Sequence, residues 1–310
     1  MNTVDQAKFD INKRQRLLAK ILLISVALSW GLGFPVMKEA LMHHSVWVIL
    51  WMRFLLAAFV ILPFALLGIR SLDGLGWRVG AILGIWLFFS FLFLIIGLRY
   101  TSTMNTGLLA GLYIILVPLL AGPLLRKPSN IGAKLGALLG LCGLCIISTQ
   151  GVQSFQAGDL LVIIGSVFTA LHILALDRLT KNHSPSGLAF IQILTVAILS
   201  FVMSLFLEKL PFPTQIDFQL IRSLIITAVF ATAFAFLVQT KFQKYTTPTH
   251  AILIYNLESI FAALFATWLL EEMLRPEIFL GGSLIVIGMM VSEIWPQLSK
   301  CLLLKINRRR

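Results

Sequence analysis

The chain has 310 residues, of which 58% are hydrophobic and 12% are charged, and its formal net charge is +12. Soluble globular proteins carry about 25% charged residues, so this composition excludes an ordinary soluble enzyme or binding domain. Long apolar runs recur along the chain and indicate a polytopic membrane protein. The basic residues lie between these runs and at both termini, which argues against a nucleic-acid-binding surface. Cys142 and Cys145 lie within an apolar run and are expected to pack as small hydrophobic residues rather than bind a metal.

About ten apolar runs are each about 20 residues long, which at about 1.5 Å per residue spans a hydrocarbon core of about 30 Å. In the first half, helices are expected at about 17–37, 45–68, 77–98, 103–125 and 131–148. In the second half, they are expected at about 158–176, 185–207, 220–238, 248–270 and 276–294. The first run has no small-residue cleavage pattern, so we expect a retained first helix rather than a removed signal peptide.

Two long segments of the chain, 100–143 and 245–288, align with each other without a gap. Their shared residues are Tyr100 and Tyr245, Thr101 and Thr246, Leu108 and Leu253, Leu112 and Leu257, Leu124 and Leu269, Leu125 and Leu270, Gly136 and Gly281, and Gly143 and Gly288. The first two expected helices of each half also align without a gap, which pairs Trp30 with Thr169, Lys38 with Asp177, Ser45 with Ser184, and Arg53 with Gln192. Each half has about five spans, an odd number, so the second half must enter the membrane from the opposite side. The sequence therefore predicts an all-α membrane protein with about ten transmembrane helices in two inverted five-helix repeats.

Basic residues gather on one side of the predicted bundle, which includes both ends of the chain. The opposite side holds only Lys38, Arg99, Lys209, Arg222 and Arg275. Because loops rich in Lys and Arg stay in the cytoplasm, we expect both termini inside the cell. We therefore divide the chain into a cytoplasmic tail at 1–16, a first repeat at 17–150, a linker at 151–157, a second repeat at 158–295 and a basic cytoplasmic tail at 296–310.

Several motifs together resemble a known transporter family. Residues 29–38 read SWGLGFPVMK, which resembles the WGxxFxxxK pattern of the first helix in the EamA type of the drug/metabolite transporter superfamily. Arg53 and Phe54 resemble the RF pair of its second helix, and residues 158–160 resemble the start of its second repeat. The segment 245–288 resembles the ninth helix and the acidic end that follows it, with a glutamate at 272. The resemblance covers nearly the whole chain.

The resemblance implies ten helices in two inverted repeats and transport of small organic solutes across a bacterial inner membrane. It also implies a central cavity lined mainly by helices one to four and six to nine, with helices five and ten at the periphery. Ser259 stands where the family often has proline, and Arg126 and Lys127 replace an acidic residue after helix four. Family members carry amino acids, other metabolites, nucleotide-like molecules and drugs, so the resemblance leaves the solute open.

Glu258 is the strongest candidate for a functional residue, because an acid in the middle of an apolar span is costly and usually faces a cavity. It could contact a solute amine or couple transport to protons; the alternative is a structural hydrogen bond to a neighbouring helix. Tyr255 precedes it by one turn and shares its face. Tyr113 is its partner in the repeat alignment and could line a cavity or pack. Asn105 and Asn256 could bind a solute or join helices.

The other candidates are polar or aromatic residues on the expected spans. Trp30 and Phe34 lie on one stripe and could form a cavity wall or ordinary packing. Arg53 could hold a carboxylate with two hydrogen bonds, or tie helices together. The remaining candidates are Trp86 and Gln239 on the stripes of spans three and eight, His172 on span six, and Gln192 as the repeat partner of Arg53. Aromatic stripes and buried histidines are more often structural than solute-binding.

The chain carries none of the phosphate-binding, zinc-protease or nucleophile-elbow motifs that would indicate an enzyme, and no cofactor is predicted. We therefore expect a gradient-driven or facilitative transporter of small organic solutes, best described as an amino acid or metabolite exporter that works by alternating access. The alternatives are an uptake carrier for a nucleotide-like or other metabolite, or a channel or receptor. The expected partners are a small solute and membrane lipid, without nucleic acid. Proton coupling is left open, and the chain is expected to be a monomer or a weak homodimer.

Overall fold

The computed structural model describes residues 3–101, 103–125, 131–148, 156–180, 183–246, 248–270, 276–277, 279–284, 286–288, 290–291 and 295. Every regular element among these residues is a helix. Seven of the helices are long and apolar enough to cross a membrane, and shorter apolar helices lie at Tyr113–Gly122, Ile131–Gly143 and Phe279–Gly288. These segments correspond to the ten expected spans, which confirms the prediction of an all-α membrane protein.

The first repeat begins with three long helices, α1 (Thr3–Leu41), α2 (Val46–Arg70) and α3 (Gly74–Tyr100). It continues with α4 (Thr103–Ala110), α5 (Tyr113–Leu125) and α6 (Ile131–Ser148). Ser45 begins α2 because its side chain accepts a hydrogen bond from the backbone of Trp47, and Asp73 begins α3 in the same way. These caps satisfy backbone N–H groups that have no partner inside the helix.

The second repeat begins with α7 (Ala157–Leu179) and α8 (Pro185–Leu207). Its third span joins α9 (Phe218–Leu224), the π-helix η1 (Ile225–Phe234), α10 (Ala235–Phe242) and the 3₁₀-helix η2 (Gln243–Tyr245). The fourth span contains α11 (Pro248–Tyr255) and α12 (Leu257–Leu270). The hydroxyl of Thr101, just after α3, bonds to Asp159 at the start of α7. This contact puts the start of α7 at the end of the bundle where α1 finishes, as inverted repeats require.

The fourth span of each repeat is broken, which corrects the expectation of continuous helices at 103–125 and 248–270. The breaks fall at residues 111–112 and at residue 256, which are aligned positions in the two repeats. Gly111 has a low helix propensity. The side chain of Asn256 donates to the carbonyl of Ile252, and such local bonds compete with the regular helix. Each break therefore has a cause in the residue that occupies it.

The third span of the second repeat also differs from the expected uniform helix at 220–238. Its middle ten residues are π-helical, and the span continues beyond 238 to Tyr245. The hydroxyl of Thr232 donates to the carbonyl of Thr227, five residues earlier, which is the spacing of a π-helical turn. π-Helical turns inside longer helices are frequent at functional sites.

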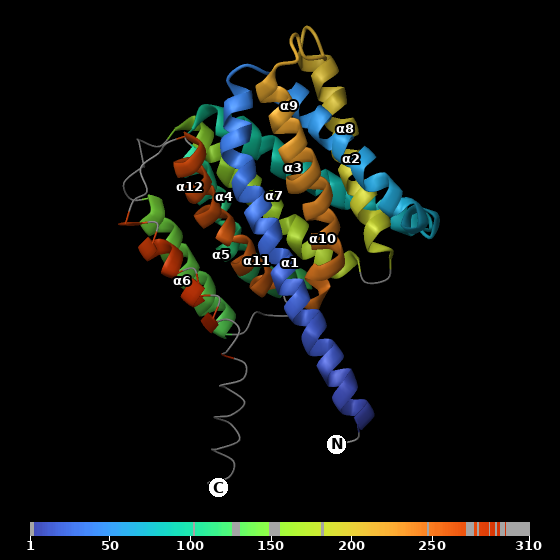
Figure 1. The fold of residues 1–310 in the computed structure, drawn as a ribbon, viewed down its shortest axis with the longest axis vertical. Coiled ribbons are helices and arrows are strands. Elements are labelled where there is room, and N and C mark those ends of the chain that lie inside the picture. The colour runs from blue at the N-terminus through green and yellow to red at the C-terminus, as the bar shows by residue number, and fades with distance from the viewer. Residues whose placement is uncertain are drawn as a thin grey trace.

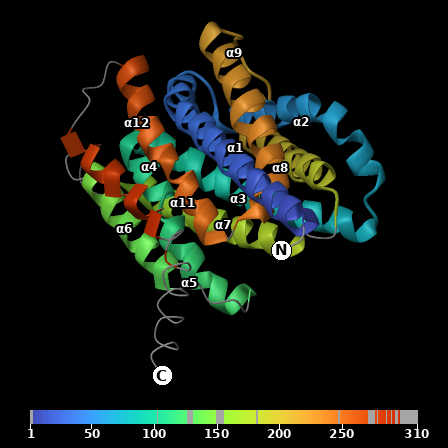
Figure 2. The same cartoon turned by 60° about the horizontal axis from the view of Figure 1, so that its bottom comes forward.

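The two repeats interlock rather than stand apart. Helix α2 packs on α8 and α3 packs on α7, while α1 crosses in front of η1, α10 and α12 (Figure 1). Helix α6 and the last helix, at 279–288, lie side by side at the periphery (Figure 2), where α6 also packs on α4, α5 and α11. A Cβ atom on Gly288 would lie 2.6 Å from the carbonyl oxygen of Gly136, so only glycine permits this approach. Gly136 of α6 therefore packs against the last helix of the same chain.

Candidate functional site

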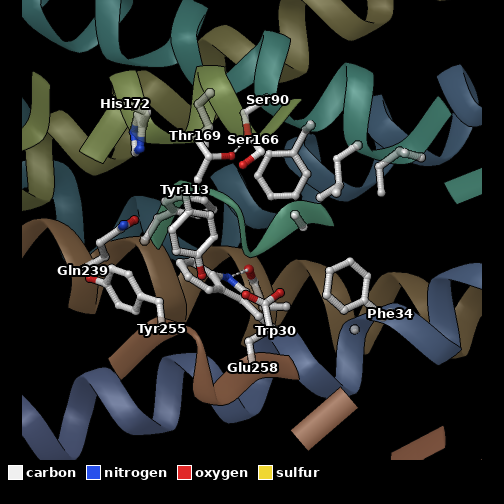
Figure 3. Close-up of a pocket in the computed structure, with 18 of the residues that line it drawn as sticks. Trp30, Phe34, Ser90, Tyr113, Ser166, Thr169, His172, Gln239, Tyr255 and Glu258 are labelled. Atoms are coloured by element: carbon white, nitrogen blue, oxygen red, sulfur yellow. Dashed lines mark hydrogen bonds between the residues drawn. The ribbon is translucent and has the colours of Figure 1, made fainter. Parts of the chain in front are cut away.

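A central cavity lies between the two repeats and contains about 820 Å³ of empty space, counted out to its mouth. The lining residues come from α1, α2, α3, α4 and α5 of the first repeat and from α7, η1, α10, α11 and α12 of the second. Figure 3 shows most of these residues as sticks. The polar and amphipathic lining residues are Trp30, Arg53, Ser90, Tyr113, Ser166, Thr169, His172, Gln239, Tyr255 and Glu258. The apolar lining residues are Gly33, Phe34, Met37, Leu87, Phe91, Leu94, Ile95, Ala110, Ile173, Ala231 and Phe236.

Glu258 lies in the first turn of α12, immediately after the break in the ninth span. Its side chain is half-buried and lies at the cavity, close to Trp30 and Tyr113 (Figure 3). Among the described residues, no side chain or backbone group forms a hydrogen bond with its carboxylate. Gly31 of α1 allows this approach, because a Cβ there would lie 2.9 Å from the Glu258 carbonyl oxygen. The carboxylate is therefore placed to meet a polar group of a solute.

Arg53 enters the cavity from α2 and is almost wholly buried, with 4% of its surface exposed. Its Nε donates to the Thr232 hydroxyl at 2.8 Å, and its Nη2 donates to the Ala231 carbonyl at 3.4 Å. The guanidinium carbon lies 4.8 Å from the centre of the Phe91 ring, a favourable cation–π arrangement. Within the described part of the chain, Nη1 makes no hydrogen bond. One side of the guanidinium is thus held while another remains able to bind an anion.

The π-helical segment η1 anchors a second cavity residue at the same point. The indole Nε1 of Trp30 donates to the Ala231 carbonyl at 2.9 Å, the oxygen that also accepts from Arg53. The Trp30 ring packs against Tyr255 and Phe236, with ring centres 5.2 Å and 5.9 Å away. A single stretch of the second repeat therefore orients two side chains of the first.

The opposite wall, on α3 and α7, is lined by hydroxyl groups and a histidine. The Ser90 and Thr169 hydroxyls lie 2.6 Å apart, whereas the buried Ser166 hydroxyl has no partner in the described structure. Nε2 of His172 lies 2.8 Å from Oε1 of Gln192. Because an amide oxygen only accepts hydrogen bonds, His172 carries a proton on Nε2. This wall can hydrogen-bond a solute but carries no charged side chain.

The structure brings most of the predicted site residues to this one cavity. Those that line it are Trp30, Phe34, Arg53, Tyr113, His172, Gln239, Tyr255 and Glu258. Gln192 lies behind the wall, where it bonds to both His172 and Thr240. Trp86 lies outside the lining and packs beside Phe168.

Of the two asparagine candidates, Asn256 does not line the cavity. Asn256 is buried at the break in the ninth span and donates to Ile252, so its role there is local. Asn105 is in α4, and its side chain lies outside the described residues.

Sequence reasoning did not select Ser90, Ser166, Thr169 and Phe91, which the structure adds to the lining. Thr169 is the aligned partner of Trp30, so projecting the repeat onto the strongest candidates would have found it. Small hydroxyl residues such as Ser166 are frequent in membrane helices and give no comparable signal. Within the described residues, His, Cys, Asp and Glu side chains form no group that could hold a metal.

Comparisons with known proteins agree on the class of the chain. The EamA-like transporter family matches residues 17–149 and 156–293. An uncharacterized transporter of Archaeoglobus fulgidus is 32% identical over 280 residues, which cover 90% of this chain and 87% of the relative. The uncharacterized transporter YyaM of Bacillus subtilis is 28% identical over 201 residues, or 61% of this chain and 65% of the relative. A solved crystal structure superimposes with a TM-score of 0.74 at 17% identity, covering 89% of this chain and 96% of that chain, and supports the fold alone.

Proposed function

We propose that this chain, which belongs to the EamA-like transporter family and is a membrane transporter, carries a small zwitterionic solute such as an amino acid. The observation that carries this proposal is the presence of two opposite charges in one cavity. Arg53 comes from the first repeat and Glu258 from the second. A solute with both a carboxylate and an amine can satisfy both groups at once.

The chemistry of the two charged groups supports this assignment. A guanidinium binds a carboxylate through planar, charge-assisted hydrogen bonds, and a carboxylate binds an ammonium group in a similar way. The Phe34 and Phe236 rings and other apolar side chains offer contacts for the remainder of the solute. A solute with only a carboxylate or only an amine would pair with Arg53 or with Glu258, and the other side chain would gain no solute partner.

The proposed mechanism is alternating access by relative motion of the two repeats. The inverted arrangement supports it, because exchanging the conformations of two like halves exposes a central site to each side in turn. We further propose that the protein resides in a bacterial inner membrane with both termini in the cytoplasm and works as an exporter. Glu258 is the group we propose for proton coupling, since it lies at the cavity without a fixed hydrogen-bond partner.

Reconstitution into proteoliposomes tests the proposed solute class. Vesicles are loaded with an unlabelled amino acid mixture, and counterflow of radiolabelled amino acids is measured with wild-type protein. Glu258→Gln should lower the saturable flux by about tenfold or more, because the variant keeps the shape but loses the charge that pairs with the amine. Asp177→Asn, at the end of α7 and outside the cavity lining, is the matched control and should behave as the wild type.

The result can contradict the proposal in distinct ways. If Glu258→Gln carries the solute at the wild-type rate, Glu258 is required neither for solute binding nor for proton coupling. Saturable counterflow of nucleotides without any amino acid flux would show that the solute is a nucleotide and not an amino acid. Flux that never saturates and shows no counterflow would indicate a channel instead of a carrier.

A further inference from the structure

We propose that two histidine–aspartate contacts, one at each end of the helix bundle, form a pair of latches that open in alternation to expose the cavity. Each latch joins one repeat to the other. The alternation rests on the proposed carrier function, whereas the latches themselves can be tested without any solute. We call the two ends the α1–α2 end and the α2–α3 end, after the turns that lie there.

The latch at the α1–α2 end is made by His44 and Asp217. His44 lies in the turn between α1 and α2 and is buried, and its Nε2 is 3.0 Å from Oδ2 of Asp217. The other carboxylate oxygen of Asp217 accepts the backbone N–H of Leu220 and begins α9. The pKa of Asp217 lies below its ordinary value, first because of this backbone bond and then because of His44. The contact ties the first repeat to the second.

The latch at the α2–α3 end is made by the equivalent residues of the opposite repeats. His183 lies in the turn between α7 and α8, and its Nδ1 is 3.8 Å from Oδ1 of Asp73. Asp73 also accepts the backbone N–H of Gly76 and begins α3. The alignment that pairs Ser45 with Ser184 also pairs the two histidines. The two aspartates both begin the third helix of their repeat, so the inverted repeat creates the same contact twice.

Each latch joins a helix of one repeat to a helix of the other, and both helices line the cavity or lead into a segment that does. At the α1–α2 end, α1 and α2 bring Trp30 and Arg53, and α9 continues directly into η1, which brings Ala231. At the α2–α3 end, α7 brings His172 and α3 brings Ser90. Releasing a latch would therefore allow wall helices of different repeats to separate at that end. In the proposed mechanism, each contact controls access to the cavity from its own end of the bundle.

The two ends are not equally strong in this structure. The His44–Asp217 contact has hydrogen-bond length, whereas the His183–Asp73 distance is longer and the Asp73 side chain is 70% exposed. Other contacts reinforce the α1–α2 end, where Glu39 forms an ion pair with Arg222. Solvent weakens ion pairs that are exposed.

The repeat explains why no equivalent ion pair is found among the described residues at the α2–α3 end. Glu39 aligns with Arg178, and Arg78 lies five residues after Asp73 as Arg222 lies five residues after Asp217, so these positions hold two like charges that cannot form an ion pair. Arg178 instead donates to the carbonyl of Leu124. The structure thus corresponds to a state with the α1–α2 latch closed and the α2–α3 latch weak.

Accessibility of a cysteine in the cavity tests the latches. Cys142, Cys145 and Cys301 are replaced by alanine, and Ser166→Cys provides one reactive thiol in the cavity wall. A membrane-impermeant maleimide is applied separately to each face of oriented vesicles, and the labelling rate is measured. The readout needs no solute, so it stands apart from the transport assay.

Weakening one latch should favour opening at that end. Asp217→Asn should raise labelling from the α1–α2 face by roughly fivefold and lower it from the other face, because the charge-assisted bond is lost. Asp73→Asn should have the opposite effect on the two faces. Asparagine also begins helices well, so both variants retain the helix starts. Asp177→Asn, the same change at an aspartate near the end of α7 that belongs to neither latch, is the control and should label as the parent does.

The pattern across the two faces decides the proposal. Opposite changes in the Asp217→Asn and Asp73→Asn variants support alternating latches. Changes of the same sign, or unchanged labelling in both, overturn the latches even if amino acid counterflow is observed. If the labelling pattern holds while no amino acid is carried, the latches stand and the proposed solute is wrong.

Discussion

The fourth spans of the two repeats share a backbone feature but differ in the chemistry they bring to the cavity. Both are broken at aligned positions, yet Tyr113 begins α5 in the first repeat while Glu258 lies in the first turn of α12 in the second. In the second spans the charged residue belongs to the first repeat instead, because Arg53 aligns with the neutral Gln192. Duplication therefore preserved the scaffold and separated the charges. A solute that needs both charges must contact both repeats.

The strongest test of this division is to give the first repeat the residue of the second. Arg53→Gln should lower flux of an amino acid by roughly 100-fold, because removing one partner of a buried charged contact costs about 2–5 kcal/mol. Radiolabelled counterflow in proteoliposomes measures the change. Arg178→Gln, an exposed arginine at the end of α7, is the control. Undiminished flux in Arg53→Gln would show that the cation serves only to join helices.

A smaller effect is expected when the arginine is kept but its support is removed. Thr232→Val deletes the hydroxyl that accepts from Nε of Arg53. The KM for an amino acid should rise about tenfold, since hydrogen bonds to charged groups contribute about 1.5–3 kcal/mol. Thr232→Ser keeps the hydroxyl and should restore the wild-type KM. The KM for the matching amino acid amide should change little, and an equal rise for both solutes would argue against a role in orienting the arginine.

The smallest effect on transport is expected behind the cavity wall. Gln192→Leu removes the bonds to His172 and Thr240 and leaves both buried groups without a partner. The cost of about 1–3 kcal/mol should lower the melting temperature by several degrees, while flux falls only about threefold. Thermal unfolding in detergent and counterflow measure the two quantities. Ser200→Ala on the same helix removes a buried hydroxyl that has no partner and should leave both unchanged.

The sequence predicted the helices well because their signals are local. Apolar runs of membrane-spanning length located the spans, and the gap-free repeat indicated inversion through the odd number of helices in each half. The breaks in the fourth spans were not predicted, since Gly111 and Asn256 are both tolerated inside membrane helices. The π-helical part of the third span in the second repeat was missed for a similar reason. Its residues are apolar except for Thr227 and Thr232, both common in membrane helices, and the wider turn is accompanied by contacts such as the bond from Arg53 to Thr232.

The residues of the candidate site also differ in whether the sequence alone could identify them. Glu258 and Arg53 could be selected from sequence because a charge within an apolar span is costly and calls for a reason. Trp86 and Gln192 could not be separated from true lining residues, because helix periodicity does not give the rotation of a helix against its neighbours. Ser166 was not selected from the sequence, because serine is common in membrane helices and gives no specific signal.

The sequence by itself determined the class of the protein, the number and approximate placement of its membrane spans, the inversion of its halves and the charges near its middle. These follow from the cost of burying polar groups in lipid and from the length of chain needed to cross it. Only the tertiary structure decided that Arg53 and Trp30 meet at one carbonyl and that His44 and His183 mark opposite ends. Those arrangements depend on how helices of different repeats rotate and pack against each other, which is a property of contacts distant in the chain.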